Sequence, residues 1–279
     1  MSATLLAAKG SPPATDAIEL AVRPSVCEVI HDQGSGVVTF DRETVESLLA
    51  SGRFFWLDLG YPTRGDFDIL REVFKFHPLA LEDSEQFNQR AKIDGYDDFV
   101  FIVVYGAGRD DDRLVEMHCF YSERFLITVH REDCPAFAEI RRRYRKRERA
   151  ADHPSLLLYR VVDGPRRQLL PEPRRARRPH RRARGRDLLK ADEKQLQEIF
   201  QMKRQLVGMR RTVTLQRDAF GSLMGGLAQL PGLAEEDEHY FRDVYDHLIR
   251  ISDLIDSYRD LLPARWTSTA QPSRTESTQ

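Results

Sequence analysis

Apolar and polar residues follow two different patterns along this chain, one in each half. The first half contains short apolar runs with the length and the β-branched or aromatic content of strands. These runs cover Cys27–Ile30, Gly36–Phe40, Phe54–Leu59, Phe99–Tyr105, Val115–Tyr121 and Phe125–His130. Segments with helical spacing lie between them, at residues 41–49, 66–76, from 78 onward and 135–150. Interleaved strands and helices predict an α/β fold, in which helices sandwich a mixed sheet.

The second half has a helical pattern. Its apolar residues recur at alternating steps of three and four, which is typical of a heptad seam. One seam comprises Ile199, Met202, Leu206, Met209, Val213, Gln216, Phe220, Leu223, Leu227 and Leu230. After a break at Pro231-Gly232, a second seam comprises Tyr240, Val244, His247, Ile251, Leu254, Tyr258 and Leu261. The pattern predicts two long antiparallel stalk helices, and it is also typical of a coiled-coil arm that joins copies of a chain.

Composition limits the class of protein. The 279 residues are 41% apolar, which is enough for a substantial core. No apolar stretch approaches the ~18 to 20 residues that cross a bilayer. Three cysteines without metal-ligand spacing indicate a reducing compartment rather than a disulfide framework.

Positive charge is concentrated in one segment. Ten of the 43 Lys and Arg residues are arginines between residues 165 and 188, where only two of the 44 Asp and Glu residues lie. Such a stretch favours binding to nucleic acid or an anionic membrane surface, or it is a disordered basic linker. It lacks the aromatic residues that stack on bases, so nucleic acid is the less favoured partner.

The chain is predicted to have five parts, whose bounds also follow from the family resemblance given below. They are a disordered tail over 1–24, an α/β/α domain over 25–163, an aberrant Arg- and Pro-rich segment over 164–189, a helical hairpin over 190–262 and a disordered polar tail over 263–279.

Acidic residues supply the candidate chemistry. Glu82 and Asp83 adjoin a predicted helix start at Pro78, where the helix dipole stabilises carboxylates. The pair also suits a divalent-cation site, because Mg2+ prefers oxygen ligands and often binds through one or two carboxylates with waters between. Asp243 is a candidate for a further carboxylate from a second copy of the chain. The alternative is that these side chains cap, or form ion pairs on, solvated helix faces.

The sequence offers little support for an enzyme. It contains no Gly-rich phosphate loop, no GxSxG elbow and no metalloprotease helix. His118 and His130 have no companion base or nucleophile at a suggestive spacing. His77 is interpreted as structural beside a helix start, and His247 as part of a hydrogen-bonded polar layer on its seam. The chain is therefore predicted not to be an enzyme.

Several motifs occur together in a fixed order. They are WLDL, HPLALED, QRAKIDGYDDFVFIV, FLITVH, LLLYRVVD and YFRDVYDH. In this combination the sequence resembles the cytosolic part of the CorA family of magnesium and divalent-cation channels. The resemblance implies an α/β/α sandwich followed by long helices, the last of which enters the membrane as a stalk.

The resemblance also implies partners and ligands. It implies a homopentamer around one ion path, with Mg2+ or Co2+ as the transported ion and regulatory Mg2+ between neighbouring subunits. Asp83 resembles one half of the primary metal site, completed by Asp243 of the neighbour, and Glu82 and Asp163 match a second, weaker site. The intact member would lie in the cell membrane with this part in the cytoplasm, whereas the chain as written is expected to be soluble.

Two segments depart from the family pattern. The Arg-rich segment replaces an acidic amphipathic helix, and after Leu262 a polar tail replaces two pore helices and their Gly-Met-Asn loop. A one-base shift of GC-rich Arg codons permits Asp and Glu codons without compelling them, and on this basis we interpret both segments as frameshifts. The chain is thus predicted to be a truncated transporter polypeptide with the cation-sensing domain but no pore. The alternatives are a soluble magnesium-sensing oligomerisation domain and a nucleic-acid or anionic-surface binder.

Overall fold

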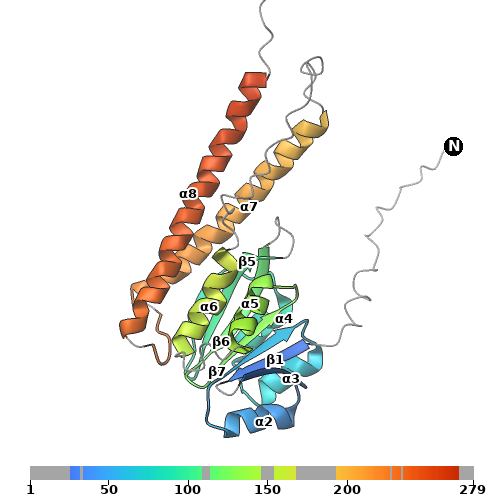
Figure 1. Ribbon diagram of the computed structural model, residues 1–279, viewed down its shortest axis with the longest axis vertical. Coiled ribbons are helices and arrows are strands. Elements are labelled where there is room, and N and C mark those ends of the chain that lie inside the picture. Colours follow the sequence, from blue (N-terminus) through green and yellow to red (C-terminus); the bar gives the residue numbers. More distant parts are fainter. Residues whose placement is uncertain are drawn as a thin grey trace, which may run out of the picture.

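A seven-stranded mixed sheet lies at the centre of the part of the molecule from which the two longest helices extend (Figure 1). The structure is a computed structural model that describes residues 26–31, 34–108, 114–145, 154–167, 193–226, 228–233 and 235–269. The strands are β1 (Val26–His31), β2 (Gly34–Val38), β3 (Phe55–Gly60), β4 (Lys92–Gly95), β5 (Val100–Ala107), β6 (Leu114–Tyr121) and β7 (Phe125–His130). Their order is β2-β1-β3-β7-β6-β5-β4, and neighbours are antiparallel except β3 and β7, which are parallel.

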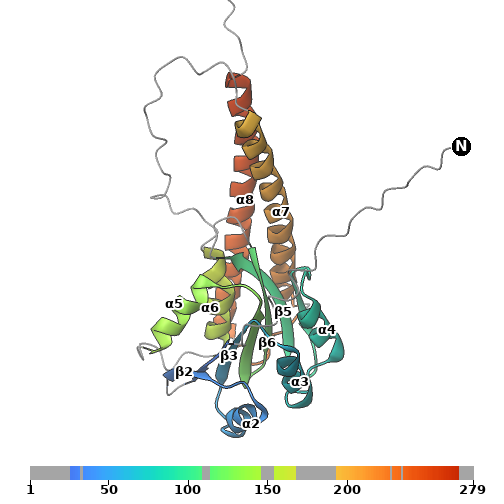
Figure 2. The same ribbon diagram turned by 90° about the vertical axis from the view of Figure 1, so that its right-hand side faces the viewer.

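Helices cover both faces of this sheet (Figure 2). The helices are α2 (Arg42–Ala50), α3 (Arg64–Glu72), α4 (Pro78–Gln86), α5 (Pro135–Arg145), α6 (Pro154–Arg167), α7 (Glu193–Met224) and α8 (Glu238–Thr269), with a short 3-10 turn η1 (Glu235–Asp237) before α8. On one face Phe67 of α3 and Leu81 of α4 join Leu57 of β3 in a buried cluster. On the other face Phe137 of α5 joins the adjacent Trp56. Consecutive strand residues point to opposite faces, and the predicted sandwich is confirmed.

Local sequence signals determine where several helices begin. Asp41 caps α2, and its Oδ1 accepts a hydrogen bond from the backbone N–H of Thr44 at 2.8 Å. Thr63 forms a reciprocal capping box with Asp66, so α3 begins before the predicted start at residue 66. It also ends earlier than predicted, ahead of Lys75, whose φ of 57° leaves the helical region.

The two long helices form an antiparallel hairpin that extends from the sheet (Figures 1 and 2). Arg210 of α7 donates to both carboxylate oxygens of Asp256 of α8, from Nε at 2.6 Å and from Nη2 at 3.0 Å. The hairpin turn begins earlier than the predicted break at Pro231-Gly232. Helix α7 ends at Met224 because Gly226 has a φ of 73°, a conformation that favours glycine.

The buried face of α8 differs from the predicted seam. Its buried apolar residues are Phe241, Val244, Leu248, Ile251 and Ile255. The spacing of three and four is as expected, but Leu254 and Tyr258 are 38% and 44% exposed. Helix α8 packs against both α6 and α7, and the surface of those two helices together selects a stripe rotated from the predicted one. As a result His247 lies at the edge of the buried face.

The structure places the ends of several helices at other residues than predicted. Helix α6 continues through Gly164–Arg167, past the predicted boundary after residue 163, and α8 continues past Leu262. Helix α5 spans Pro135–Arg145, and the rest of its predicted range, to about residue 150, lies outside the described residues. Residues 1–25, 168–192 and 270–279 lie outside the described residues, and with them the predicted N-terminal tail, most of the Arg-rich segment and the end of the C-terminal tail. The prediction of a disordered tail is wrong for residues 263–269, which belong to helix α8. Within the described part of the chain, no helix has the combination of length and apolar character that a membrane span requires.

Candidate metal centre

Asp163, Asp243 and His247 come together where α6 meets α8. One potential ligand atom of each lies within 4.8 Å of those of the other two. Nδ1 of His247 is 3.0 Å from Oδ1 of Asp163 and 3.5 Å from Oδ2 of Asp243. The Asp163 side chain is 3% exposed and that of Asp243 is 40% exposed, so the group is anchored in the interior and reaches solvent on one side.

Helical spacing on two helices produces this group. Asp243 and His247 are four residues apart on α8, which places both side chains on one face. Tyr159 and Asp163 have the same spacing on α6. The Tyr159 hydroxyl donates to Oδ2 of Asp243 at 2.8 Å, so each helix holds a side chain of the other in place.

Two carboxylates and an imidazole suit a divalent cation. Mg2+ and Ca2+ bind oxygen at about 2.0 to 2.6 Å, so donor atoms that share one ion lie about 3 to 5 Å apart. The three donors satisfy this condition. Imidazole extends the choice of ion toward Co2+ and other transition metals, which accept nitrogen ligands readily.

Glu82 and Asp83 lie elsewhere, on α4 and thus over the other face of the sheet (Figure 2). Oε1 of Glu82 accepts from the side-chain amide of Gln86 at 3.0 Å. Oδ2 of Asp83 is 2.7 Å from Nζ of Lys92. Within one chain, these two residues are not part of the Asp163, Asp243 and His247 group.

The interpretation of Glu82 and Asp83 as dipole-stabilised residues at a helix start is wrong. Helix α4 has no acidic residue in its first turn, and His77 is its N-cap. Pro78 occupies the first turn as predicted. The pair belongs to the second turn, where the helix dipole contributes little.

Three residues that contact the candidate ligands were not predicted from the sequence to do so: His247, Tyr159 and Lys92. His247 was interpreted as part of a polar layer, although its distance of four residues from Asp243 was a usable signal. The same spacing joins Tyr159 to Asp163. Lys92 carried no signal, because only folding brings β4 beside α4.

A buried positive charge lies close to Asp163. Arg166 is 1% exposed, and burial lowers the pKa of its guanidinium to about 10, against the opposing influence of Asp163. Its Nε donates to the carbonyl oxygen of Val162 at 2.7 Å. Nη1 and Nη2 are buried without a hydrogen-bond partner among the residues that the structure describes.

Known proteins are similar to this chain in sequence or in fold. The sequence profile of the family described as CorA-like Mg2+ transporter protein matches residues 51–264. The chain belongs to this CorA-like family. That it is not an enzyme agrees with membership of a transporter family.

Two curated relatives show the extent of the match. The CorA-like chain is 30% identical over 220 residues to the putative metal ion transporter YfjQ of Bacillus subtilis, covering 75% of this chain and 65% of that protein. It is 27% identical over 248 residues to the cobalt/magnesium transport protein CorA of Thermotoga maritima, covering 80% and 65%. The chain therefore spans slightly less than two thirds of the length of these relatives.

A solved structure shares the fold. The soluble domain of CorA from Methanocaldococcus jannaschii aligns with a TM-score of 0.65, over 86% of this chain and 95% of that chain. The identity is 15%, so the likeness concerns the fold alone.

Proposed function

We propose that this chain is the cation-sensing cytosolic part of a CorA-type divalent-cation transporter. In this proposal Mg2+ or Co2+ bound between neighbouring copies keeps them together, and the parent protein carries the same class of ion across a membrane. Family membership supports the transporter class, and the two curated relatives are named as transporters of metal ions and of cobalt or magnesium.

The observation that carries the proposal is the placement of the acidic residues. Asp83 lies over one face of the sheet, and Asp163, Asp243 and His247 lie over the other. A single chain does not join them, but a ring of copies would bring one face of each copy to the opposite face of the next. By the family resemblance we expect five copies, with Asp83 of one beside Asp243 of its neighbour and with Glu82 and Asp163 at a second position.

A cation at such an interface would act as a switch. When no cation is bound, the facing carboxylates repel each other and favour separation of the copies. A divalent cation bound between them favours the closed assembly, and it shifts the equilibrium by its difference in affinity for the two states. The sensor would combine Asp83 of the α/β/α domain of one copy with Asp243 on α8 of its neighbour, and the α7–α8 hairpin would transmit the change.

The donor set bears on the choice of ion. Carboxylates alone would favour Mg2+, whereas the imidazole of His247 adds a nitrogen ligand that suits Co2+. We therefore propose that Co2+ binds at Asp163, Asp243 and His247 at lower concentration than Mg2+.

Light scattering of the purified full chain tests this function. We expect Mg2+ to produce a larger assembly that EDTA reverses. The variants D83N and D243N should both lose this response, because each removes one side of the interface. D253N is the matched control, since Asp253 is an exposed acid on the same helix as Asp243. An assembly state that is the same in Mg2+ and in EDTA would contradict the proposal.

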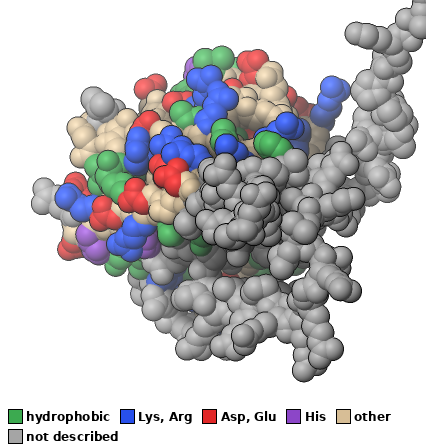
Figure 3. Space-filling view, turned by 90° about the horizontal axis from the view of Figure 1, so that it is seen from above, with side chains coloured by type: hydrophobic (Ala, Val, Ile, Leu, Met, Phe, Trp, Pro, Cys, Tyr) green, Lys and Arg blue, Asp and Glu red, His purple; other side chains and the backbone are tan. Residues whose placement is uncertain are grey.

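The nucleic-acid alternative rests on the Arg-rich segment, most of which lies outside the described residues, and the described surface in the view of Figure 3 adds no basic patch to it. Viewed from above, Lys and Arg side chains are mixed with Asp and Glu on the described part of the surface (Figure 3). A polyanion is attracted by a surface of one sign, and the described residues of this view do not form one.

A further inference from the structure

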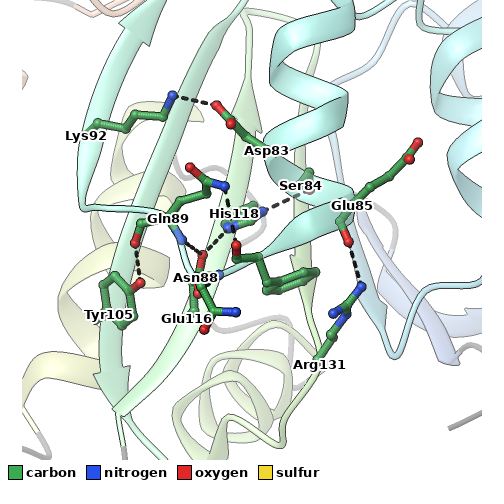
Figure 4. A network of polar contacts seen from close by, with 11 residues as sticks. Asp83, Ser84, Glu85, Asn88, Gln89, Lys92, Tyr105, Glu116, His118 and Arg131 are labelled. Carbon is green, nitrogen blue, oxygen red and sulfur yellow. Dashed lines mark hydrogen bonds and ion pairs between the residues drawn. The ribbon is translucent and has the colours of Figure 1, made fainter. Parts of the chain in front are cut away.

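An ammonium group already occupies the carboxylate at which the proposed interfacial cation would bind (Figure 4). Nζ of Lys92 is 2.7 Å from Oδ2 of Asp83 and 2.6 Å from Oδ2 of Asp94. The three side chains are between 25% and 39% exposed, so they are partly shielded from water but open to exchange. Lys92 thus shows that Asp83 accepts a cation, and that this cation belongs to the chain itself.

The backbone around this ion pair is held by one acidic side chain (Figure 4). The carboxylate of Glu116 on β6 accepts from the backbone N–H groups of Asn88 at 2.7 Å and Gln89 at 2.9 Å. It also lies 2.8 Å from Nε2 of His118, whose Nδ1 is 3.0 Å from Oγ of Ser84. Ser84 is next to Asp83 on α4, and Gln89 is close to Lys92. The network therefore fixes both partners of the ion pair relative to the sheet.

Ser84, His118 and Glu116 are connected like the nucleophile, base and acid of a hydrolytic triad, but a substrate cannot reach them. Ser84 and His118 are both 0% exposed. A nucleophile sealed in the interior cannot meet a substrate, so Ser84, His118 and Glu116 position α4 and the turn that follows it. Because these contacts hold α4 and the turn that follows it, Lys92 and Asp83 stay within reach of each other, and only their own side chains lose freedom when they pair.

We infer that Lys92 is a tethered competitor for the divalent cation at Asp83, and that Asp94 receives its ammonium group when the cation binds. The inference rests on the proposed function in that it takes Asp83 as a cation ligand. Lys92 then sets the cation concentration at which the sensor responds. Asp94 makes release easier, because the ammonium group retains one of its two carboxylates.

Two substitutions have opposite expected effects. Replacing Lys92 by Met removes the competitor, and the apparent affinity for the cation should rise by about fivefold, the size expected for a partly exposed ion pair. Replacing Asp94 by Asn leaves Lys92 with Asp83 alone, so the affinity should fall. If Lys92 mediates this fall, D94N should have little effect in the K92M background, which a double-mutant cycle measures.

The test uses Mn2+ as the probe, with free Mn2+ followed by electron paramagnetic resonance during titration of the full chain. The control is R90M, which removes one positive charge from an exposed residue two positions away. We expect K92M to bind Mn2+ more tightly than the parent, R90M to match the parent, and D83N to abolish the gain in the K92M background. Thermal unfolding of each variant verifies that it is folded.

Three outcomes would overturn the inference. They are equal Mn2+ affinity of K92M and the parent, an equal gain in R90M, and absence of Mn2+ binding by both the parent and K92M. The proposed function fails in a different way. If Mn2+ binds with the expected order of affinities but no assembly follows, the sensing interface is contradicted and the competition at Asp83 stands.

Discussion

The guanidinium of Arg166 lies over the ring of Phe220, with its central carbon 4.9 Å from the ring centroid, between α6 and α7. Both side chains are 1% exposed. A stacked ring and one backbone carbonyl compensate only part of the cost of removing a charge from water. The buried charge of Arg166 therefore lowers the stability of the folded state, and an apolar side chain would suit this position better.

Replacing Arg166 by Met should stabilise the protein. The change removes a buried charge whose Nη1 and Nη2 have no hydrogen-bond partner among the described residues, and it retains most of the side-chain volume. The free energy of unfolding should rise by about 1 to 3 kcal/mol, the cost of leaving buried polar groups unsatisfied. Urea unfolding followed by circular dichroism measures the free energy. Arg141→Met is the contrasting control, because Arg141 forms an ion pair with the buried Asp58 and its loss should destabilise. A less stable R166M protein would contradict the expectation.

The reading frame of the gene is a second prediction. Pro165 and Arg166 lie at the start of the segment that we interpret as frameshifted. Pro165 lies inside helix α6, and Arg166 is a buried charge. A proline inside a helix and a charge in the interior are both unfavourable at their positions. Such conflicts are expected where the residues did not evolve for this fold. Resequencing between the codons of Asp163 and Lys190 should reveal a one-base error or lesion on each side of residues 164–189. A confirmed, uninterrupted frame would refute the frameshift hypothesis.

Gly106 of β5 should tolerate no side chain. A Cβ at this position would overlap the Cβ of Pro165 and lie 3.1 Å from two of its backbone atoms. Gly106→Ala should therefore force β5 and α6 apart and cost about 1 to 3 kcal/mol, as overpacking does. Gly95→Ala on β4 is the matched control, since a Cβ there meets nothing within 4 Å. Thermal unfolding of both variants provides the measurement, and equal melting temperatures would contradict the predicted close contact.

The pH dependence of stability should depend on His130. Burial alone would lower the pKa of His130, but its contact with Asp58, 3.0 Å from Nε2 to Oδ1, outweighs burial and raises that pKa. A raised pKa stabilises the folded state below the unfolded value of about 6.5, and this contribution is lost as pH rises through the folded pKa. The difference in unfolding free energy between the parent and H130Q should therefore be largest near pH 6 and shrink toward pH 9.

Asp58, the carboxylate of the same pair, affects the stability of the folded state at low pH. Burial would raise the pKa of Asp58, but the charges of His130 and Arg141 and the hydrogen bond from Thr128 hold it below its usual value. Its contribution is present above the unfolded pKa near 4 and is lost as pH falls through the folded pKa. Urea unfolding from pH 3 to pH 9 tests both ends, and a pH-independent difference for H130Q would exclude this account.

Local signals predicted most elements of the fold. The strands at Phe55–Gly60 and Phe125–His130 are mostly apolar runs, and the N-cap Asp41 of α2 and Pro78 in the first turn of α4 are short-range features. Strand β4 was missed because Lys92–Gly95 is short and polar and forms only by pairing with β5. The buried face of α8 was predicted at the wrong residues because α8 packs against both α6 and α7, whereas the prediction assumed a single heptad seam.

The sequence by itself determined the family, the layered α/β order, the helical second half and the identity of the acidic candidates, because motifs, caps and periodicity are local properties of a chain. Tertiary structure alone decided which charges meet. It placed His247 beside Asp163, it assigned Asp83 to Lys92, and it buried Arg166 against Phe220. These contacts join residues from different helices and strands, and their distances depend on how those elements pack, which no spacing along the chain specifies.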